Sequence, residues 1–461
     1  MNKLAQKLLL CIVAVLAFFT KGESQDGNPL QFLRTVSQSS TYNPAFQNRS
    51  EKLVIGLPLI SGFYFDWNSN FSTDYFFYNG FDYSFARFYN ALDEPGITTA
   101  NISSPLIYLS LRSGRQNFSL SIRERVLAET QFDNKVLDFI DKGLASYYGN
   151  DESFGPINFK AFYYREFALT YATEIGDGLS IGIRPKLLTA HFYYDVVDFK
   201  FETKTDLEND TLQLIPSGSY KISGPVTVNY DPENSKTEIL PNATSSDYLF
   251  GFRNLSPAVD IGIDFRNDKG FAIAASVSDL GFLKFKHDNY ALEYYGAIQY
   301  NKKDLYQSND PNSNDSIPRY LEPRLALQQL SDTIAYNISV GQQPQTITQH
   351  IPIKINLSAR QALSKQTEGG LSGQISFYEN NTQHYLTGFV HTTFQRGFEV
   401  AATLSVLNFN KILPGAGFSY TGRWAQYYLS ANNITGLIKP ASAKYLNLCF
   451  GVNFLFSTAE K

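Results

Sequence analysis

Apolar and polar residues alternate along many short stretches of this chain. The clearest case is the stretch 445–456, YLNLCFGVNFLF, in which every second position is apolar. These positions are Leu446, Leu448, Phe450, Val452, Phe454 and Phe456. Strict alternation predicts a β-strand with one apolar face and one milder face. The stretch is also long enough to cross a bilayer as a tilted strand, which takes about 9–11 residues.

The same alternation returns in pairs of stretches that are joined by short turn sequences. Residues 166–175 and 179–184 flank Gly176-Asp177-Gly178, and residues 259–265 and 271–277 flank the turn 266–270. Other pairs surround turns near residues 113–117, 394–398 and 421–423, and Gly369-Gly370 lies near the return of a further pair that starts at 351–360. Such pairs are typical of β-hairpins. We therefore expect an all-β fold, an antiparallel meander of hairpins without crossover helices.

Three segments interrupt this meander. Residues 134–148 have apolar positions three or four apart, which predicts a short amphipathic helix in a loop, in the lumen or on a core. Residues 202–247 and 301–350 are long, polar and rich in proline, and the second has a helical pattern at 325–330. Insertions of this length are unusual in compact domains but typical of the extracellular loops of outer-membrane barrels. Strand counting leaves the side of the second insertion open.

The amino terminus has the layout of a secretory signal peptide. Lys3 and Lys7 precede an apolar run at 8–19, and small residues before a cut after Ser24 complete the signal. We therefore expect a signal peptide at 1–24 and an N-terminal segment at 25–52 that would suit a lumenal plug. The barrel is expected at 53–456, with its first strand within 53–65, and a C-terminal tail at 457–461.

The alternation alone fits a membrane barrel and a soluble barrel equally well. Composition helps to distinguish the two. Aromatic residues make up 15% of the chain, and charged residues only 18%, against about 25% in ordinary soluble domains. Tyr and Phe form the girdles of membrane barrels. Without the signal peptide one cysteine remains, Cys449, so no internal disulfide can form. Together these features favour a barrel in the lipid of the outer membrane, with its apolar positions facing lipid.

The milder parity of the strands then faces the lumen and carries isolated charges. These are Glu166, Glu174, Arg184, Asp260, Asp264, Lys354 and Arg360. They could line a polar path or ligand site, or they could form a network of paired charges that fills a narrow barrel. We favour the network, because an unpaired buried charge is costly. Cys449 lies on the same parity and is expected to pack.

The sequence carries no motif for catalysis or for a cofactor. His384 and His391 are seven residues apart, so they lie on opposite faces of one strand and cannot share a metal ion. We find no zinc-protease motif, phosphate-binding loop or nucleophile elbow. The net charge of −4 argues against a nucleic-acid partner. We expect a protein that is not an enzyme and that uses no metal or cofactor.

Three short motifs resemble a family of outer-membrane barrels. They are Asn43-Pro44-Ala45, residues 164–169 (YREFAL) and residues 277–282 (VSDLGF). In this order they are similar to a Bacteroidota outer-membrane barrel family of unknown function, related to PorV and to the FadL-type long-chain fatty-acid transporters. The final strand resembles the C-terminal signal that the barrel-insertion machinery reads, although five residues follow Phe456.

The resemblance implies a transmembrane barrel of about 14 strands, with no settled activity. The larger group includes transporters of small hydrophobic molecules and partners of type IX secretion and gliding motility. Transport of such a molecule is therefore the leading functional hypothesis. The alternative is a scaffold barrel, without enzyme activity, that docks secretion or gliding components.

Overall fold

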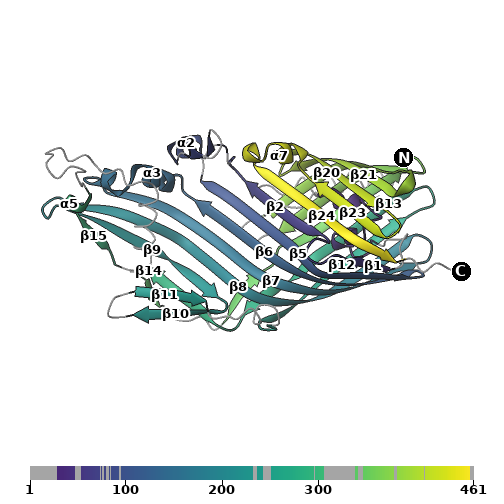
Figure 1. The fold of residues 1–461 in the computed structure, drawn as a ribbon, viewed down its shortest axis with the longest axis horizontal. Coiled ribbons are helices and arrows are strands. Elements are labelled where there is room, and N and C mark those ends of the chain that lie inside the picture. Colours follow the sequence, from purple (N-terminus) through teal and green to yellow (C-terminus); the bar gives the residue numbers. More distant parts are fainter. Residues whose placement is uncertain are drawn as a thin grey trace.

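The computed structural model is an antiparallel β-barrel that is drawn out along its strands (Figure 1). It describes residues 28–456 except 47–52, 73, 75–76, 79–81, 84, 93–94, 232–235, 242–250, 295, 306–337, 341–345, 378–381 and 410. The expected signal peptide, the expected C-terminal tail and the helical pattern at 325–330 lie outside the described residues.

The barrel wall is a single closed sheet. In its first half are β1 (Leu53–Gly56), β2 (Phe63–Ser69), β5 (Gly96–Ser113), β6 (Gln116–Phe132), β7 (Glu152–Ile175), β8 (Leu179–Asp206), β12 (Leu255–Arg266) and β13 (Phe271–Phe285). In its second half are β18 (Ile353–Ala362), β19 (Thr367–Phe377), β20 (Thr382–Thr393), β21 (Phe398–Leu407), β22 (Lys411–Thr421), β23 (Ala425–Ala431) and β24 (Tyr445–Phe456). Because β1 and β2 follow one course, the described ring has 14 members, as expected.

The last strand closes this ring. β24 pairs with β23 on one side and with β1 and β2 on the other. In the register, Leu53 lies opposite Phe456, and Phe63 lies opposite Phe450. The expected first strand at 53–65 is thus divided into β1 and β2 by a turn at 57–62.

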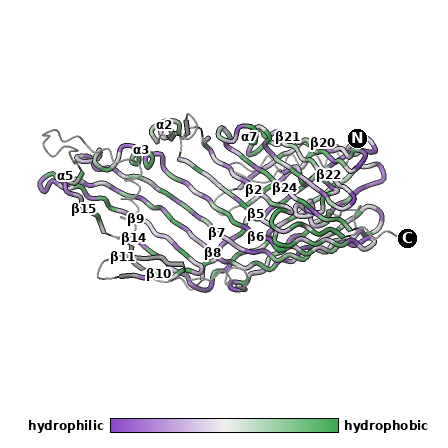
Figure 2. Tube along the Cα trace, viewed as in Figure 1, coloured by the Kyte–Doolittle hydropathy of each residue, from purple (hydrophilic) through white to green (hydrophobic). Residues whose placement is uncertain are grey.

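The alternation along the strands corresponds to two faces of the wall, as the alternating colours in Figure 2 illustrate. In β24 the apolar parity points outward, and Phe454 and Phe456 are exposed, whereas Asn447 and Asn453 are fully buried. Other exposed apolar side chains include Leu109, Leu169, Ile183, Ile263, Leu404 and Leu429. Along β24 the outer face is therefore apolar and the inner face carries buried polar residues, the inverse of a soluble barrel.

The two ends of the barrel differ. At one end, which we call the short-turn end, tight turns join β5 to β6, β7 to β8, β12 to β13, β18 to β19, β20 to β21 and β22 to β23. At the opposite end, the long-loop end, both polar insertions leave the ring, after β8 and after β13. The second insertion therefore starts on the same side as the first.

Several strands continue the wall far beyond the rest of the ring at the long-loop end. β8 has 28 residues, and at about 3.3 Å per residue such a strand is about 90 Å long. Its outer half pairs with β9 (Thr211–Ser223), which pairs with β14 (Asn289–Tyr294) and β15 (Ile298–Asn301). Short strands complete this region: β3 (Phe77–Tyr78), β4 (Asp82–Tyr83), β10 (Val226–Asp231), β11 (Lys236–Pro241), β16 (Ile338–Val340) and β17 (Ile347–His350).

Helices are short and lie mostly in the loops. They are η1 (Pro29–Phe32), η2 (Ser37–Thr41), α2 (Phe85–Ala91), α3 (Lys135–Lys142), η4 (Leu144–Tyr147), α5 (Lys302–Leu305), η5 (Gln395–Gly397), α7 (Ile434–Ile438) and η6 (Pro440–Ser442). Within the described parts of the chain, none has the length and apolar character needed to cross a membrane.

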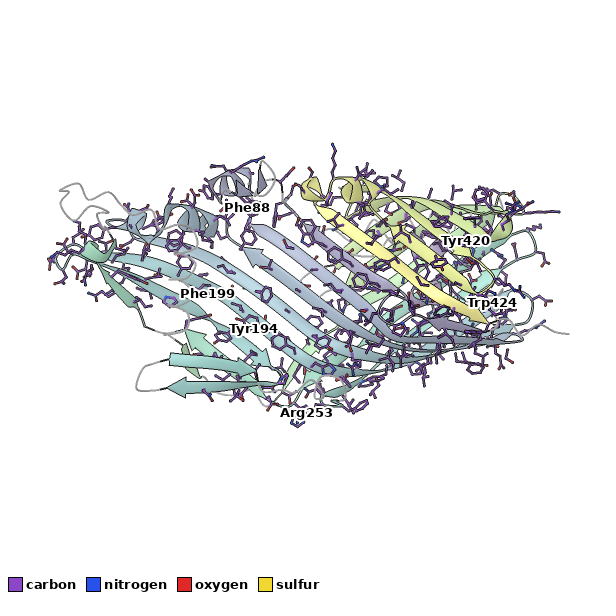
Figure 3. All side chains as sticks on the ribbon, viewed as in Figure 1. Phe88, Tyr194, Phe199, Arg253, Tyr420 and Trp424 are labelled. Carbon is purple, nitrogen blue, oxygen red and sulfur yellow. The ribbon has the colours of Figure 1, made fainter. Side chains whose placement is uncertain are left out.

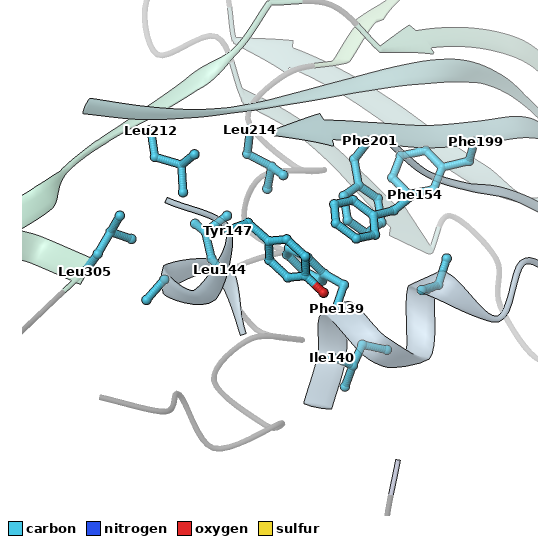
Figure 4. Close-up of a cluster of buried hydrophobic side chains, with 12 residues drawn as sticks. Phe139, Ile140, Leu144, Tyr147, Phe154, Phe199, Phe201, Leu212, Leu214 and Leu305 are labelled. Atoms are coloured by element: carbon cyan, nitrogen blue, oxygen red, sulfur yellow. The ribbon is translucent and has the colours of Figure 1, made fainter. Parts of the chain in front are cut away.

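The predicted helix at 134–148 corresponds to α3 and η4, which pack on the extended strands rather than in the lumen between the ring strands. Phe139 of α3 lies 4.6 Å from Phe201 and 5.0 Å from Phe154, measured between ring centroids. Leu212 and Leu214 of β9 complete this apolar cluster (Figure 4). Figure 3 shows Phe199 and Tyr194 on the same extension, far from Tyr420 and Trp424 at the short-turn end.

Candidate functional site in the barrel lumen

Residues 28–46 lie inside the barrel, and we call them the N-terminal segment. The Asn28 side chain accepts a hydrogen bond from the Leu30 N–H, and Pro29 occupies the first position of η1, so this turn begins with a regular cap. The side-chain amide of Asn28 donates to the side-chain oxygen of Asn447 on β24, at 2.6 Å. The side-chain oxygen of Asn28 accepts from the hydroxyl of Ser430 on β23, at 2.7 Å. This end of the segment is thus bound to one side of the wall.

The other end of the segment reaches the opposite side of the ring. Asn43 donates to the main-chain carbonyls of Ile263 and Ala275, on β12 and β13, at 3.0 and 3.1 Å. Gly182 and Gly262 face this contact, and a Cβ atom at either would collide with Pro44 or Asn43. Asn43-Pro44 therefore packs where two neighbouring strands lack side chains, and the segment crosses the lumen.

A cluster of buried ionic side chains lies beyond the N-terminal segment, toward the long-loop end. Its centre is Lys186 of β8, whose side chain is only 2% exposed. The Lys186 ammonium lies 2.6 Å from Asp279, 2.8 Å from Asp260 and 3.4 Å from Glu166. One cation thus joins carboxylates from three strands, β7, β12 and β13.

Three arginines complete this cluster, which we call the central ion cluster. Arg123 lies 2.5 Å from Glu166, and Arg125 lies 3.4 Å from Glu166 and 3.2 Å from Asp279. Arg184 pairs with Asp260 at 3.0 Å and also donates to the main-chain carbonyl of Ser40 in the N-terminal segment. Four cations therefore face three carboxylates.

A β-bulge allows Asp279 to join the cluster. The register between β12 and β13 shifts between Val259 and Ile261, so both Ser278 and Asp279 are buried. Asp279 has a φ of 61°, and its N–H donates to Asp260 at 2.7 Å. This left-handed conformation, uncommon outside glycine, turns the carboxylate toward Lys186.

The lumen changes character on either side of the central ion cluster. A cavity of about 90 Å³ lies between part of the cluster and the N-terminal segment, and it is lined by Lys354, Gln38 and Tyr108, among others. Toward the long-loop end, buried apolar side chains from one arc of the wall pack into an apolar layer: Leu127, Phe162, Tyr164, Leu188, Tyr193, Leu283, Phe285, Ile347 and Ile351. Tyr164 of this layer covers Arg125, whose guanidinium carbon is 5.4 Å from the ring centroid.

The charges expected in the lumen have different environments. Glu166, Arg184 and Asp260 belong to the central ion cluster. Asp264 and Arg360 pair with each other nearer the short-turn end, at 3.0 Å. The two remaining residues belong to neither group: Lys354 lines the cavity, and Glu174 is partly buried beside the turn from β7 to β8.

Sequence reasoning missed four members of the central ion cluster. Arg123 and Arg125 lie on the inward parity of β6, and Lys186 continues the parity of Arg184, so the signal was present in the alternation. Asp279 departs from that parity because of the bulge. Among the described residues, no group of three or more His, Cys, Asp or Glu side chains could hold a metal ion.

Comparison with protein families gives one match, to a family of unknown function (DUF5723), over residues 44–432. The chain belongs to this family. The predicted membership of a family of unknown function is therefore confirmed, while the relation to PorV and to Bacteroidota stays a prediction. No curated protein matches the chain.

Several solved structures are similar in fold. The toluene transporter TbuX from Ralstonia pickettii has 10% identity and a TM-score of 0.45, over 91% of this chain and 93% of its own. The toluene transporter TodX from Pseudomonas putida has 6% identity and a TM-score of 0.40, over 94% of each chain. A FadL homologue from Pseudomonas aeruginosa has 9% identity and a TM-score of 0.40, over 95% of this chain and 99% of its own.

Proposed function

We propose that this barrel resides in the outer membrane and carries a small hydrophobic molecule across it. The observation that supports transport is the apolar layer in the lumen. A polar, water-filled lumen is typical of diffusion porins, whereas here a layer of apolar side chains lies on the long-loop side of the central ion cluster. Such a lumen favours passage of an apolar molecule over that of ions, and the toluene transporters of similar fold agree with this class of cargo.

The outer surface supports the proposed location. Ring strands β18 to β22 have 10 to 12 residues, close to the about 9–11 that cross a bilayer. Exposed aromatic residues lie near both ends of these ring strands. Near the short-turn end they are Phe118, Tyr171, Phe265, Phe394, Phe398, Trp424 and Phe456. Toward the long-loop end they are Phe252, Phe377 and Phe409. Aromatic girdles of this kind lie at the two membrane interfaces.

We expect the expressed protein in the outer-membrane fraction, with a gel mobility that changes on heating. A closed barrel resists the detergent in the gel until heat unfolds it, because its backbone groups are all paired around the ring. Fractionation followed by gels of heated and unheated samples checks this. Recovery in the soluble periplasm or the medium would contradict the proposed location.

Transport in this barrel requires the N-terminal segment to move, since it crosses the lumen. Thr35 of the segment lies beside Ser419 of β22, with their hydroxyl oxygens 3.3 Å apart. We expect the double variant Thr35→Cys/Ser419→Cys to form a disulfide that locks the segment and reduces uptake of labelled toluene by cells at least about tenfold. Dithiothreitol should restore uptake to the rate of the wild type.

Each single cysteine variant is the control, because it perturbs the same position without a crosslink. Thiol labelling after denaturation verifies the redox state, with Cys449 as the thiol common to all variants. Wild-type uptake by the locked barrel would exclude a path past the segment. A scaffold would instead show no cargo uptake in any variant and stoichiometric secretion or gliding subunits in a native-membrane pull-down.

A further inference from the structure

A second cavity, separate from the central ion cluster, opens at the short-turn end of the barrel. Its volume is about 320 Å³, within the range of cavities that hold small ligands. The N-terminal segment contributes Arg34 and Phe46, and the turn from β18 to β19 contributes Lys365. Arg360 of β18 and His391 of β20 also line it. We call this space the rim cavity.

Arg360 has hydrogen-bonding capacity that the protein does not use. Its Nη2 donates to both carboxylate oxygens of Asp264, at 3.0 and 3.1 Å, and its Nε lies 3.7 Å from Glu368. Arg360 is only 6% exposed, yet its Nε and Nη1 atoms are buried without a hydrogen bond to any described residue. Buried unsatisfied donors of a charged group are costly and call for a partner.

Arg34 has no ion-pair partner among the described carboxylates. Its guanidinium carbon lies 3.3 Å from the centroid of the Phe46 ring, and its buried Nε makes no hydrogen bond to a described residue. The neighbouring Glu399 is used by other groups: it accepts from the Arg34 main-chain N–H at 2.9 Å and is 2.6 Å from His391. Stacking on Phe46 fixes the plane of the guanidinium and leaves its edge for a ligand.

The charges around the rim cavity do not balance. Among the described residues that line it, four side chains are cationic (Arg34, Arg266, Arg360 and Lys365) and three are carboxylates (Asp264, Glu368 and Glu399). Even with His391 neutral, one positive charge is in excess. Unused N–H groups of a guanidinium form strong, charge-assisted hydrogen bonds to a carboxylate.

We propose that the rim cavity binds a small monoanionic carboxylate with an apolar body. The carboxylate takes the donors of Arg34 and Arg360, and the apolar body lies against Phe46. This site goes beyond the proposed transport function and does not depend on it, because the cavity opens at the short-turn end and is formed with the N-terminal segment in place.

Calorimetric titration of the purified full-length barrel in detergent with benzoate tests the proposal. We expect saturable binding of benzoate and none of benzamide, which has the same shape without the charge. Arg34→Gln should weaken benzoate binding at least about tenfold, and Lys365→Gln should weaken it less, because Lys365 is exposed. Arg115→Gln, an exposed arginine on another turn at the same end, is the matched control and should bind as the wild type does.

Three results would overturn the proposal: no benzoate binding by the wild type, equal binding of benzamide, or unchanged affinity in Arg34→Gln. Inorganic phosphate is titrated in parallel, and tighter binding of phosphate than of benzoate would overturn the assignment to a carboxylate. Heat-dependent gel mobility verifies the fold of each variant. Should Arg34→Gln not fold, Lys365→Gln decides, since Lys365 lies on an exposed turn, and its unchanged affinity would then count against the site.

Discussion

Removal of Tyr445–Phe456 is expected to abolish assembly of the barrel. This segment is β24, which pairs with β23 on one side and with β1 and β2 on the other. Without it, two sheet edges would face the proposed lipid environment, where each unpaired backbone group costs several kcal/mol. The inward Asn447 and Asn453 would also be lost, and with them the hydrogen bonds to Asn28 and Gln38 that hold the N-terminal segment.

Heat-dependent gel mobility of the outer-membrane fraction measures this effect. The matched control is deletion of residues 457–461, which follow β24 and which we expect to be dispensable. A folded barrel that lacks β24 would show that the ring can close without it.

A single substitution at Phe456 distinguishes the contribution of β24 to barrel stability from its proposed recognition by the insertion machinery. Phe456 is exposed at the end of β24, so Phe456→Asp places a charge on the outer face near the proposed membrane interface. A charge there costs only about 0–1 kcal/mol. We therefore expect normal folding from urea into detergent but reduced assembly in cells, where the proposed C-terminal insertion signal would lose its last aromatic residue. If Phe456→Asp gave the wild-type yield of folded barrel both in detergent and in cells, a role for Phe456 in recognition would be unsupported.

The faces of the wall could be predicted from the sequence because alternation reports burial directly. Leu169 and Ile183 face outward and Glu166 and Arg184 face inward, as their parity indicated. The length of β8 could not be predicted. Alternation in exposure fades after Leu187, where the run from Leu188 to His191 is buried at every position. In that part of the strand, both faces contact protein, and the sequence pattern no longer separates them.

Which charges meet could not be predicted, because pairing depends on register and on the bulge. Lys186 lies opposite Ala258 in the register, but its ammonium reaches Asp260 and Asp279. The bulge that turns Asp279 inward breaks the two-residue period from which inward positions are read. Gly182 and Gly262 were visible in the alternation, but the main chain of Asn43-Pro44 that fills their space comes from a distant part of the sequence.

The substitution Lys186→Met should destabilise the barrel strongly. Lys186 is the cation shared by Glu166, Asp260 and Asp279, all of them buried. Methionine has a similar length but no charge, so the three carboxylates lose their common partner while staying out of water. Breaking a buried ionic group by removal of one partner costs about 3–5 kcal/mol. We expect a lower midpoint of urea unfolding, followed by the loss of heat-dependent mobility.

A second substitution tests whether the charge itself is responsible. Asp279→Asn in the Lys186→Met background removes one of the stranded carboxylates, so the double variant should recover part of the lost free energy of unfolding, and the coupling between the two sites should exceed about 0.5 kcal/mol. Lys365→Met, on an exposed turn, is the control and should unfold as the wild type does. An unchanged unfolding midpoint for Lys186→Met would mean that the arginines of the central ion cluster alone neutralise its carboxylates. Four cations face three carboxylates in this cluster, so one cation is in excess by number; Lys186 is needed because it is the only one of the four that contacts all three carboxylates.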